Sequence, residues 1–167
     1  HRFLTQATFG PDAASIQRVV DIGYEAWIDE QLRLPATRQL DYLRTLPQPN
    51  TALDRHDAWF QAAIKGSDQL RQRMAFALSQ ILVTADSGGI DTRMIAEYSD
   101  LLARGAFGSY RSLLGQVTFS PTMAQWLTYV RNRAAYASGG STVLPDENYA
   151  REVMQLFSFG LVKRNLD

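Results

Sequence analysis

The chain has 167 residues with 17 basic and 17 acidic side chains, so its formal net charge is zero, and neither sign forms a long run. This balance excludes the basic footprint of a protein that binds nucleic acid or an anionic membrane, and the length fits one ordinary domain. The absence of cysteine excludes disulfides, thiolate nucleophiles and cysteine-ligated metals, and with two histidines we expect neither a metal site nor a cofactor.

The first part of the chain predicts two helices that meet at a glycine. Gly-Pro-Asp opens the first helix, and Gly23 suits the left-handed position that ends one. The second helix begins at Tyr24, ends before Pro35 and should pack through Trp27, together with Ile28 and Leu32 on the same side. A weaker helix is expected over residues 38–46.

The middle of the chain contains the most apolar helix. A helix over residues 54–65 ends at Gly66, with its apolar side formed by Trp59, Phe60, Ala63 and Ile64. The next runs from Asp68 to Val83, and the only polar residues in its body from Met74 onward are Ser79 and Gln80. A helix with so little polar surface belongs inside a fold, and we therefore expect it to be the central one.

Helices are also predicted along the rest of the chain, and no convincing strand is seen. The expected ranges are residues 92–104, 109–117, a helix that starts at Ser120 and Pro121, and 146–160. Between the last two, YASGGSTVLP has the composition of a loop. The prediction is a single all-α domain over residues 1–167, with about eight or nine helices around the central apolar one.

No apolar run approaches the ~20 residues needed to cross a bilayer, and no signal peptide is present. The chain begins at His1 and not at Met. We therefore expect an N-terminal fragment or a processed form of a longer protein.

The last predicted helix, NYAREVMQLFSFG, carries two adjacent charged residues. Arg151 lies four residues after Glu147, which favours a local ion pair worth ~0.2–0.5 kcal/mol. Glu152 has no cation three or four residues away, and its place among apolar residues predicts partial burial. A buried carboxylate needs a partner, and Arg73 on the central helix is the candidate that we propose.

Such a pair has two interpretations. The first is a structural tie between two helices of a scaffold or binding module. The second is an enzyme, possibly a hydrolase, in which Glu152 acts as acid, base or metal ligand and Arg73 positions it. Asn148, Tyr149, Arg151 and Gln80 are then the candidate ligand-binding residues.

Other side chains favour ordinary structural roles. Asp86, Asp91, Glu97 and Asp100 are interpreted as loop caps and solvated helix faces, and His56 as a surface or capping residue. The three tryptophans are better explained by core packing than by a glycan-binding surface. No phosphate-binding loop and no Gly-x-Ser-x-Gly motif occurs.

Four segments in this order, RFLTQATFG, RQRMAFALSQ, SPTMAQWL and PDENYAREVMQLFSFG, give the chain a resemblance to a bacterial family known as domain of unknown function 1800. The resemblance covers essentially the whole chain, and NYARE is its most specific element. Many relatives place a histidine where this chain has Phe157 or Ser158, so a mechanism with an imidazole there is not expected.

The resemblance implies a longer, exported protein with a periplasmic or extracellular setting, whose C-terminal part is absent here. It also implies an exported sulfatase-like protein as a partner. It assigns no reaction, so both the scaffold and the envelope enzyme remain open.

Overall fold

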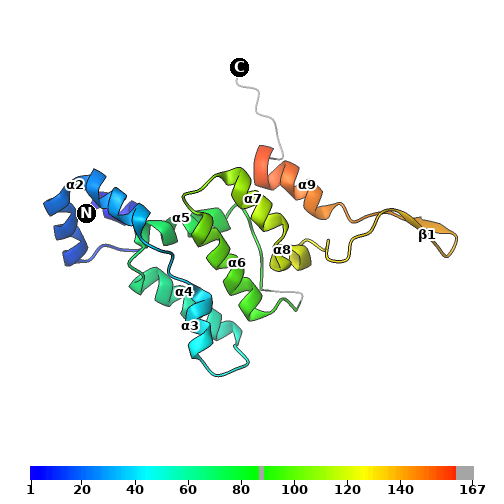
Figure 1. The fold of residues 1–167 in the computed structure, drawn as a ribbon, viewed down its shortest axis with the longest axis horizontal. Coiled ribbons are helices and arrows are strands. Elements are labelled where there is room, and N and C mark those ends of the chain that lie inside the picture. Colours follow the sequence, from blue (N-terminus) through cyan, green and yellow to red (C-terminus); the bar gives the residue numbers. More distant parts are fainter. Residues whose placement is uncertain (87–88, 161–167) are drawn as a thin grey trace, which may run out of the picture.

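The computed structural model describes residues 1–86 and 89–160, which are mainly helical, and the all-α prediction is confirmed (Figure 1). In chain order the elements are α1 (Arg2–Ala7), α2 (Ala13–Arg33), α3 (Gln39–Thr45), α4 (Ala52–Lys65), α5 (Gln69–Ser79), α6 (Thr92–Gly105), α7 (Tyr110–Thr118), α8 (Pro121–Trp126), β1 (Tyr136–Ser138), β2 (Ser141–Val143), α9 (Asn148–Met154) and a π-helical turn, η1 (Gln155–Phe159).

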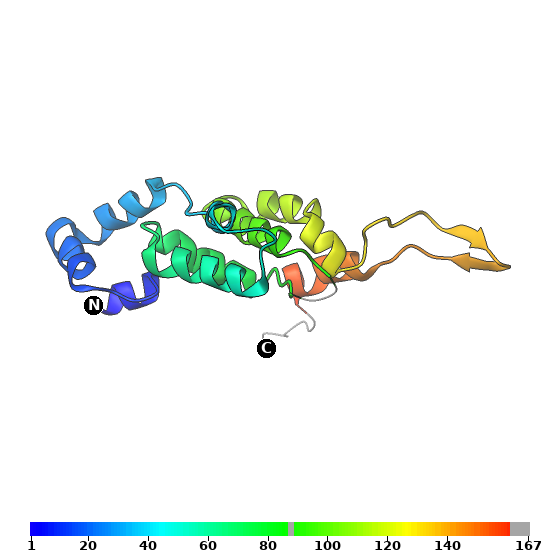
Figure 2. The ribbon, with the colours of Figure 1, turned by 90° about the horizontal axis from the view of Figure 1, so that it is seen from below.

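The helices form an elongated body, with α1 and α2 at one end and the β1–β2 hairpin projecting from the other (Figures 1 and 2). In the middle, α6 packs against α3, α4, α5, α7 and α8. It has the most buried residues of the described helices: Ile95, Ala96, Tyr98, Asp100, Leu102 and Ala103. The centre of the fold is therefore α6.

The expectation that residues 68–83 form the central helix is wrong. Within α5 only Gln72 and Ala75 are buried, while Met74 and Phe76 are largely exposed. The helix ends at Ser79, so the apolar residues Ile81 and Val83 lie beyond it and are also exposed. α5 packs against α1, α2, α4 and α6, yet part of its apolar surface stays exposed, so apolar composition alone did not indicate the most buried helix.

The two helices predicted around Gly23 are present as the two halves of α2. The N-cap residue Asp12 accepts the Ser15 N–H in a capping box, and Gly23 interrupts the helix with φ 80°. A positive φ at this kink suits glycine, which has no Cβ. Trp27 is buried against Leu4 and Ala7 of α1, as predicted.

The principal core joins α5, α6, α7 and α8 to the end of α9. Its buried residues are Ala75, Leu82, Tyr98, Leu102, Ala103, Leu113, Val117, Met123, Leu127 and Phe157. A smaller cluster between α3, α4 and α6 contains Leu43, Ala58 and Ala96. Burying apolar side chains of this size stabilises a fold by roughly 1.5–3 kcal/mol each for the larger ones.

The hairpin of β1 and β2 corrects the prediction that residues 136–145 are a loop. The strands pair antiparallel, with Tyr136 opposite Val143 and Ser138 opposite Ser141. Gly139 and Gly140 both have positive φ, which is the requirement of the tight turns that join such strands. The Gly-Gly pair between Tyr136 and Val143 was the available signal.

The last helix is present, with its end altered. Asp146 Oδ1 accepts the Asn148 N–H at 2.8 Å, but the N-cap position belongs to Glu147, whose side chain makes no capping bond. Gly160 ends the segment with φ 80°, at the predicted end of the helix. The final turn, η1, is π-helical. Across the described residues, no helix is long and apolar enough to cross a membrane.

Candidate functional site

The proposed pair between Arg73 and Glu152 does not form. The Arg73 guanidinium carbon lies 5.3 Å from the centre of the Phe9 ring and 5.8 Å from that of Phe76, close to α1. Glu152 lies on α9, which is attached to α7 through Tyr149 and Phe157. Among the described residues, no ion pair joins the two side chains, so this prediction is wrong.

Glu152 has no alternative partner for one of its oxygens. The side chain is half-buried, and its Oε2 atom is buried without a hydrogen-bond partner. The expected partial burial is therefore correct. What the sequence could not supply is which helix lies opposite, because Arg73 and Glu152 are 79 positions apart in the chain.

The candidate ligand-binding residues of α9 are used locally. Arg151 Nη1 donates to Glu147 at 3.1 Å, as predicted, and its Nη2 donates to Asn148 Oδ1 at 2.8 Å. The Tyr149 hydroxyl lies 2.7 Å from that of Thr118, and burial raises the pKa of Tyr149. These residues anchor α9, whereas Gln80 lines a pocket elsewhere.

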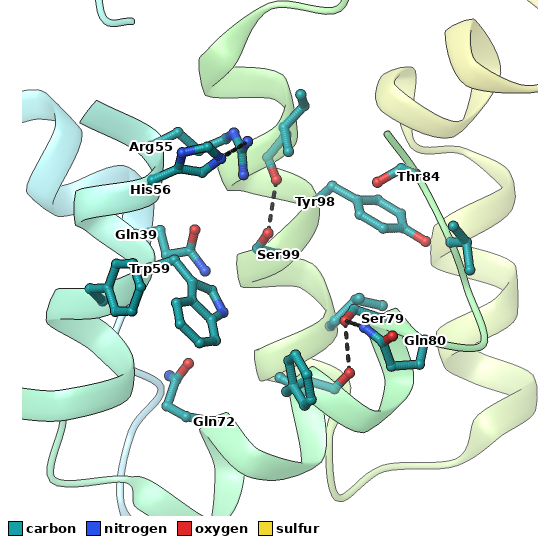
Figure 3. A pocket seen from close by; sticks show the side chains of 16 residues that line it. Gln39, Arg55, His56, Trp59, Gln72, Ser79, Gln80, Thr84, Tyr98 and Ser99 are labelled. Carbon is teal, nitrogen blue, oxygen red and sulfur yellow. Dashed lines mark hydrogen bonds between the residues drawn. The ribbon is translucent and has the colours of Figure 1, made fainter. Parts of the chain in front are cut away.

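That pocket has a volume of about 590 Å³ (Figure 3). Residues of α4, α5 and α6 and the segment after α5 form its walls, and Gln39 reaches it from the start of α3. Its size is in the range of small-molecule sites. Its lining comprises Gln39, Arg55, His56, Trp59, Phe60, Gln72, Ala75, Phe76, Ser79, Gln80, Val83, Thr84, Ile95, Tyr98, Ser99 and Leu102.

Two glutamines project on either side of Trp59 (Figure 3). Gln72 Nε2 donates to Thr37 O at 3.0 Å and to Asp68 Oδ2 at 2.9 Å, so this amide is held in place. Gln39 is only 5% exposed, and its side-chain amide has no hydrogen bond to any described residue. Its amide atoms are not among the buried atoms that lack a partner, so they are open to the pocket, which makes Gln39 a candidate for binding a ligand.

Gln39 is fixed by a buried carboxylate from α6. Asp100 is 1% exposed and accepts the backbone N–H groups of Gln39 and Leu40, at 2.7 and 3.1 Å. Burial raises the pKa of Asp100 to about 6, although both backbone donors and Arg38 act in the other direction. The expectation that Asp100 lies on a solvated face is wrong, because α6 is buried on several sides.

Asp68 fixes Thr37, two residues before Gln39, in the same way. It is fully buried, and it accepts the Thr37 N–H at 2.9 Å and the Thr37 hydroxyl at 2.5 Å. Asp68 lies at the N-cap position of α5, but its side chain makes no capping bond. Asp68 and Asp100 together position the segment that carries Gln39 at the pocket.

A charged cluster closes one end of the pocket. Arg55 Nη2 lies 3.0 Å from Asp86 Oδ2 and 2.8 Å from His56 Nε2. Since a guanidinium only donates, Nε2 is the acceptor and the ring proton is on Nδ1. His56 is exposed, as expected of a surface residue, and it also lines the pocket. It does not cap α4, because the capping box of that helix is formed by Thr51 and Asp54. The carboxylate balances the charge of Arg55.

The remaining polar groups of the pocket are hydroxyls that donate to the protein itself. Ser99 donates to Ile95 O, Tyr98 to Leu82 O and Ser79 to Phe76 O. Of the other predicted acids, Asp91 caps α6 and Glu97 pairs with Arg104 at 2.8 Å, in agreement with their interpretation as surface residues.

In the part of the chain that the structure describes, no group of three or more histidine or acidic residues is placed to hold a metal ion. The family model described as "Protein of unknown function (DUF1800)" matches residues 2–165. No curated protein and no solved structure matches the chain.

Proposed function

The chain belongs to the DUF1800 family, and we propose that it is a helical binding module whose α4–α5–α6 pocket binds a neutral, polyhydroxylated ligand such as a sugar residue. The observation that carries this proposal is the side-chain amide of Gln39, which lines the pocket and has no hydrogen-bond partner among the described residues.

The charges of the pocket favour a neutral ligand. Arg55 is paired with Asp86, and its contact with His56 occupies a second direction of the guanidinium. No unpaired cation or carboxylate therefore remains among the described lining residues to bind an ion. Recognition is left to amides, hydroxyl lone pairs and aromatic surface.

A sugar ring has hydroxyl groups that suit the amides of the pocket and a C–H face that suits its aromatic surface. An amide offers two donors and an acceptor side by side, which suits adjacent hydroxyls. The Trp59 ring is held by edge contacts with Phe9 and Phe60, at 5.5 and 5.0 Å between ring centres. An aromatic ring of this kind packs against the C–H face of a sugar, and the site combines apolar surface with a few placed polar groups.

The experiment compares Gln39→Leu with wild type. We expect glucose, N-acetylglucosamine and their soluble oligomers to shift the NMR signals of the Gln39 amide and the Trp59 indole, at millimolar concentrations. Leucine keeps the side-chain size but removes the free amide, so binding should weaken at least about tenfold, while the free energy of unfolding should change by less than about 1 kcal/mol.

Two control variants separate binding from folding. Gln6→Leu, at an exposed site on α1, should leave binding unchanged. Gln72→Leu should lower stability, because Asp68 and Thr37 would lose a donor. Sugar titrations that shift no pocket signal, or that are unaffected by Gln39→Leu, would refute the proposal.

From the resemblance we also propose the setting: an exported bacterial protein, periplasmic or extracellular, that acts beside an exported sulfatase-like protein. The test is fractionation of cells that express the full-length protein from its own gene, with an affinity tag to recover the sulfatase-like protein. Recovery in the cytosol alone would contradict this setting.

An envelope enzyme that uses Glu152 and is completed by a C-terminal part is the second proposal. It is favoured by one observation, the buried Oε2 atom that lacks a hydrogen-bond partner. Glu152 does not line the α4–α5–α6 pocket, so the binding module is the better-supported function. A Glu152→Gln variant of the full-length protein with undiminished activity on every substrate found would exclude this role.

A further inference from the structure

A second cavity, of about 400 Å³, lies on another side of α6. Its walls come from α3, α6 and the junction between α7 and α8, and they are mainly apolar. Leu40, Met94 and Leu101 contribute to them. The site described above uses Ile95, Ser99 and Leu102 of the same helix, so the two cavities occupy neighbouring sides of α6.

The walls of this groove carry two arginines from different helices. Arg93 donates through Nε to Asn50 Oδ1 at 3.0 Å, and it has no carboxylate partner among the described residues. Arg44 pairs with Asp41 at 3.1 Å on the exposed side of α3. Glu97 also lines the groove, but Arg104 neutralises it. The charge that remains available at the groove is therefore positive.

The Ser120 hydroxyl adds a free polar group to the groove. Its side chain lines the groove and makes no hydrogen bond to a described residue, and its oxygen is not among the buried atoms that lack a partner, so it is open to the groove. The neighbouring Thr122 hydroxyl, by contrast, donates to Met94 O at 2.7 Å. An accessible hydroxyl next to apolar surface suits a ligand with its own carbonyl or carboxylate group.

Phe119 indicates the size of the occupant. It follows α7 at the edge of the groove, and 88% of its surface is exposed. A small molecule inside the groove would leave this ring in water. An occupant that also covers Phe119 has to extend beyond the groove, as a protein segment does, and exposed aromatic rings and arginines are enriched at protein interfaces.

We propose that this groove docks a segment of a partner protein in which a large apolar side chain lies next to an aspartate or glutamate. The apolar side chain fills the groove, and the carboxylate binds the Arg93 guanidinium. A second apolar residue of the segment covers Phe119. Ser120 donates its hydroxyl to a carbonyl of the segment. The docking is independent of the sugar pocket and does not require it to be occupied.

The test is selection from a random peptide library on the wild-type chain, with counter-selection on the Arg93→Ala/Phe119→Ser double variant. We expect the enriched peptides to combine Leu or Phe with Asp or Glu. Measured by fluorescence anisotropy, the affinity of a synthetic peptide of this kind should fall about tenfold in each single variant. Added salt should weaken binding less in Arg93→Ala, because one ion pair is lost there.

Matched controls are available at exposed residues that do not line the groove. Arg111→Ala on α7 removes an exposed arginine without an ion pair among the described residues, and Leu53→Ser on α4 removes an exposed apolar residue. Both should bind like wild type. The proposal fails if no peptide is enriched over the double variant, if basic peptides are enriched, if the controls lose as much affinity, or if decanoate competes with the same dependence on Arg93.

Discussion

Residues 34–40, which link α2 to α3, and residues 136–160, which form a C-terminal arm, are attached to the body in different ways. In the link, the backbone N–H groups of Thr37 and Gln39 bind two buried carboxylates, Asp68 and Asp100. In the arm, both strands of the hairpin are exposed, and the carboxylate of Glu152 has one buried oxygen without a partner.

The two regions differ in how many hydrogen bonds their buried polar groups make. Asp68 and Asp100, the two buried carboxylates that hold the link, each accept at least two hydrogen bonds from it, so the position of the link is specified by the fold. The arm is held by apolar packing and by hydrogen bonds that are exposed or only partly buried, among them those of the Tyr110, Tyr149 and Thr128 hydroxyls and of Asn132. We therefore expect changes in the link to cost much more stability than comparable changes in the arm.

The largest effect is expected for Asp68→Ala. The substitution leaves the Thr37 N–H, the Thr37 hydroxyl and the Gln72 amide without their acceptor in a buried place. The free energy of unfolding should fall by about 4 kcal/mol, measured by urea denaturation. Asp41→Ala, which removes an exposed carboxylate from α3, should cost less than about 1 kcal/mol. Equal losses of stability in the two variants would contradict the idea that the buried carboxylates hold the link more firmly than exposed contacts do.

The second effect is a pH dependence from Asp100. Burial raises the pKa of this carboxyl to about 6 in the folded protein, above its ordinary value of 3.8. The folded state therefore binds the proton more tightly than the unfolded state. Its contribution to stability is complete below about pH 4 and is lost as the pH rises through about 6, over a range of about 2–3 kcal/mol.

Urea denaturation between about pH 4 and pH 7, on wild type and Asp100→Asn, isolates this contribution. The difference between the two proteins should change with pH, because every other titrating group is common to both. Asp12, Asp54 and Asp146 have pKa values lowered by hydrogen bonds, so they act with the opposite sign and at lower pH. A difference that is flat across the range would contradict the assignment to Asp100.

Local sequence signals predicted most of the helices correctly. Gly23 and the stop at Gly160 are each determined by backbone conformation, and both are in place. The helix that starts at Pro121 ends at Trp126, and Thr128 and Arg131 beyond it have positive φ.

The same local sequence signals could not predict contacts between segments that are distant in the chain. Asp100 has polar neighbours in sequence, and only the docking of α3 onto α6 buries it. Arg73 and Glu152 each lacked a partner nearby, but the helices that carry them face different neighbours. The pocket was missed because Gln39 and Gln72 are ordinary glutamines in helical patterns, and their importance arises from burial alone.

The smallest effect on stability is expected for Glu152→Gln, which lies in the C-terminal arm. Glutamine keeps the shape of the side chain and removes its charge. Because no ion pair to Glu152 exists among the described residues, the free energy of unfolding should change by less than about 0.5 kcal/mol, measured by thermal and urea denaturation. A clear loss would mean that the carboxylate is paired after all and that the arm is tied as firmly as the link. A clear gain would mean that the charge is retained at a cost to the fold, which is the property of a functional carboxylate and would favour the enzyme over the binding module.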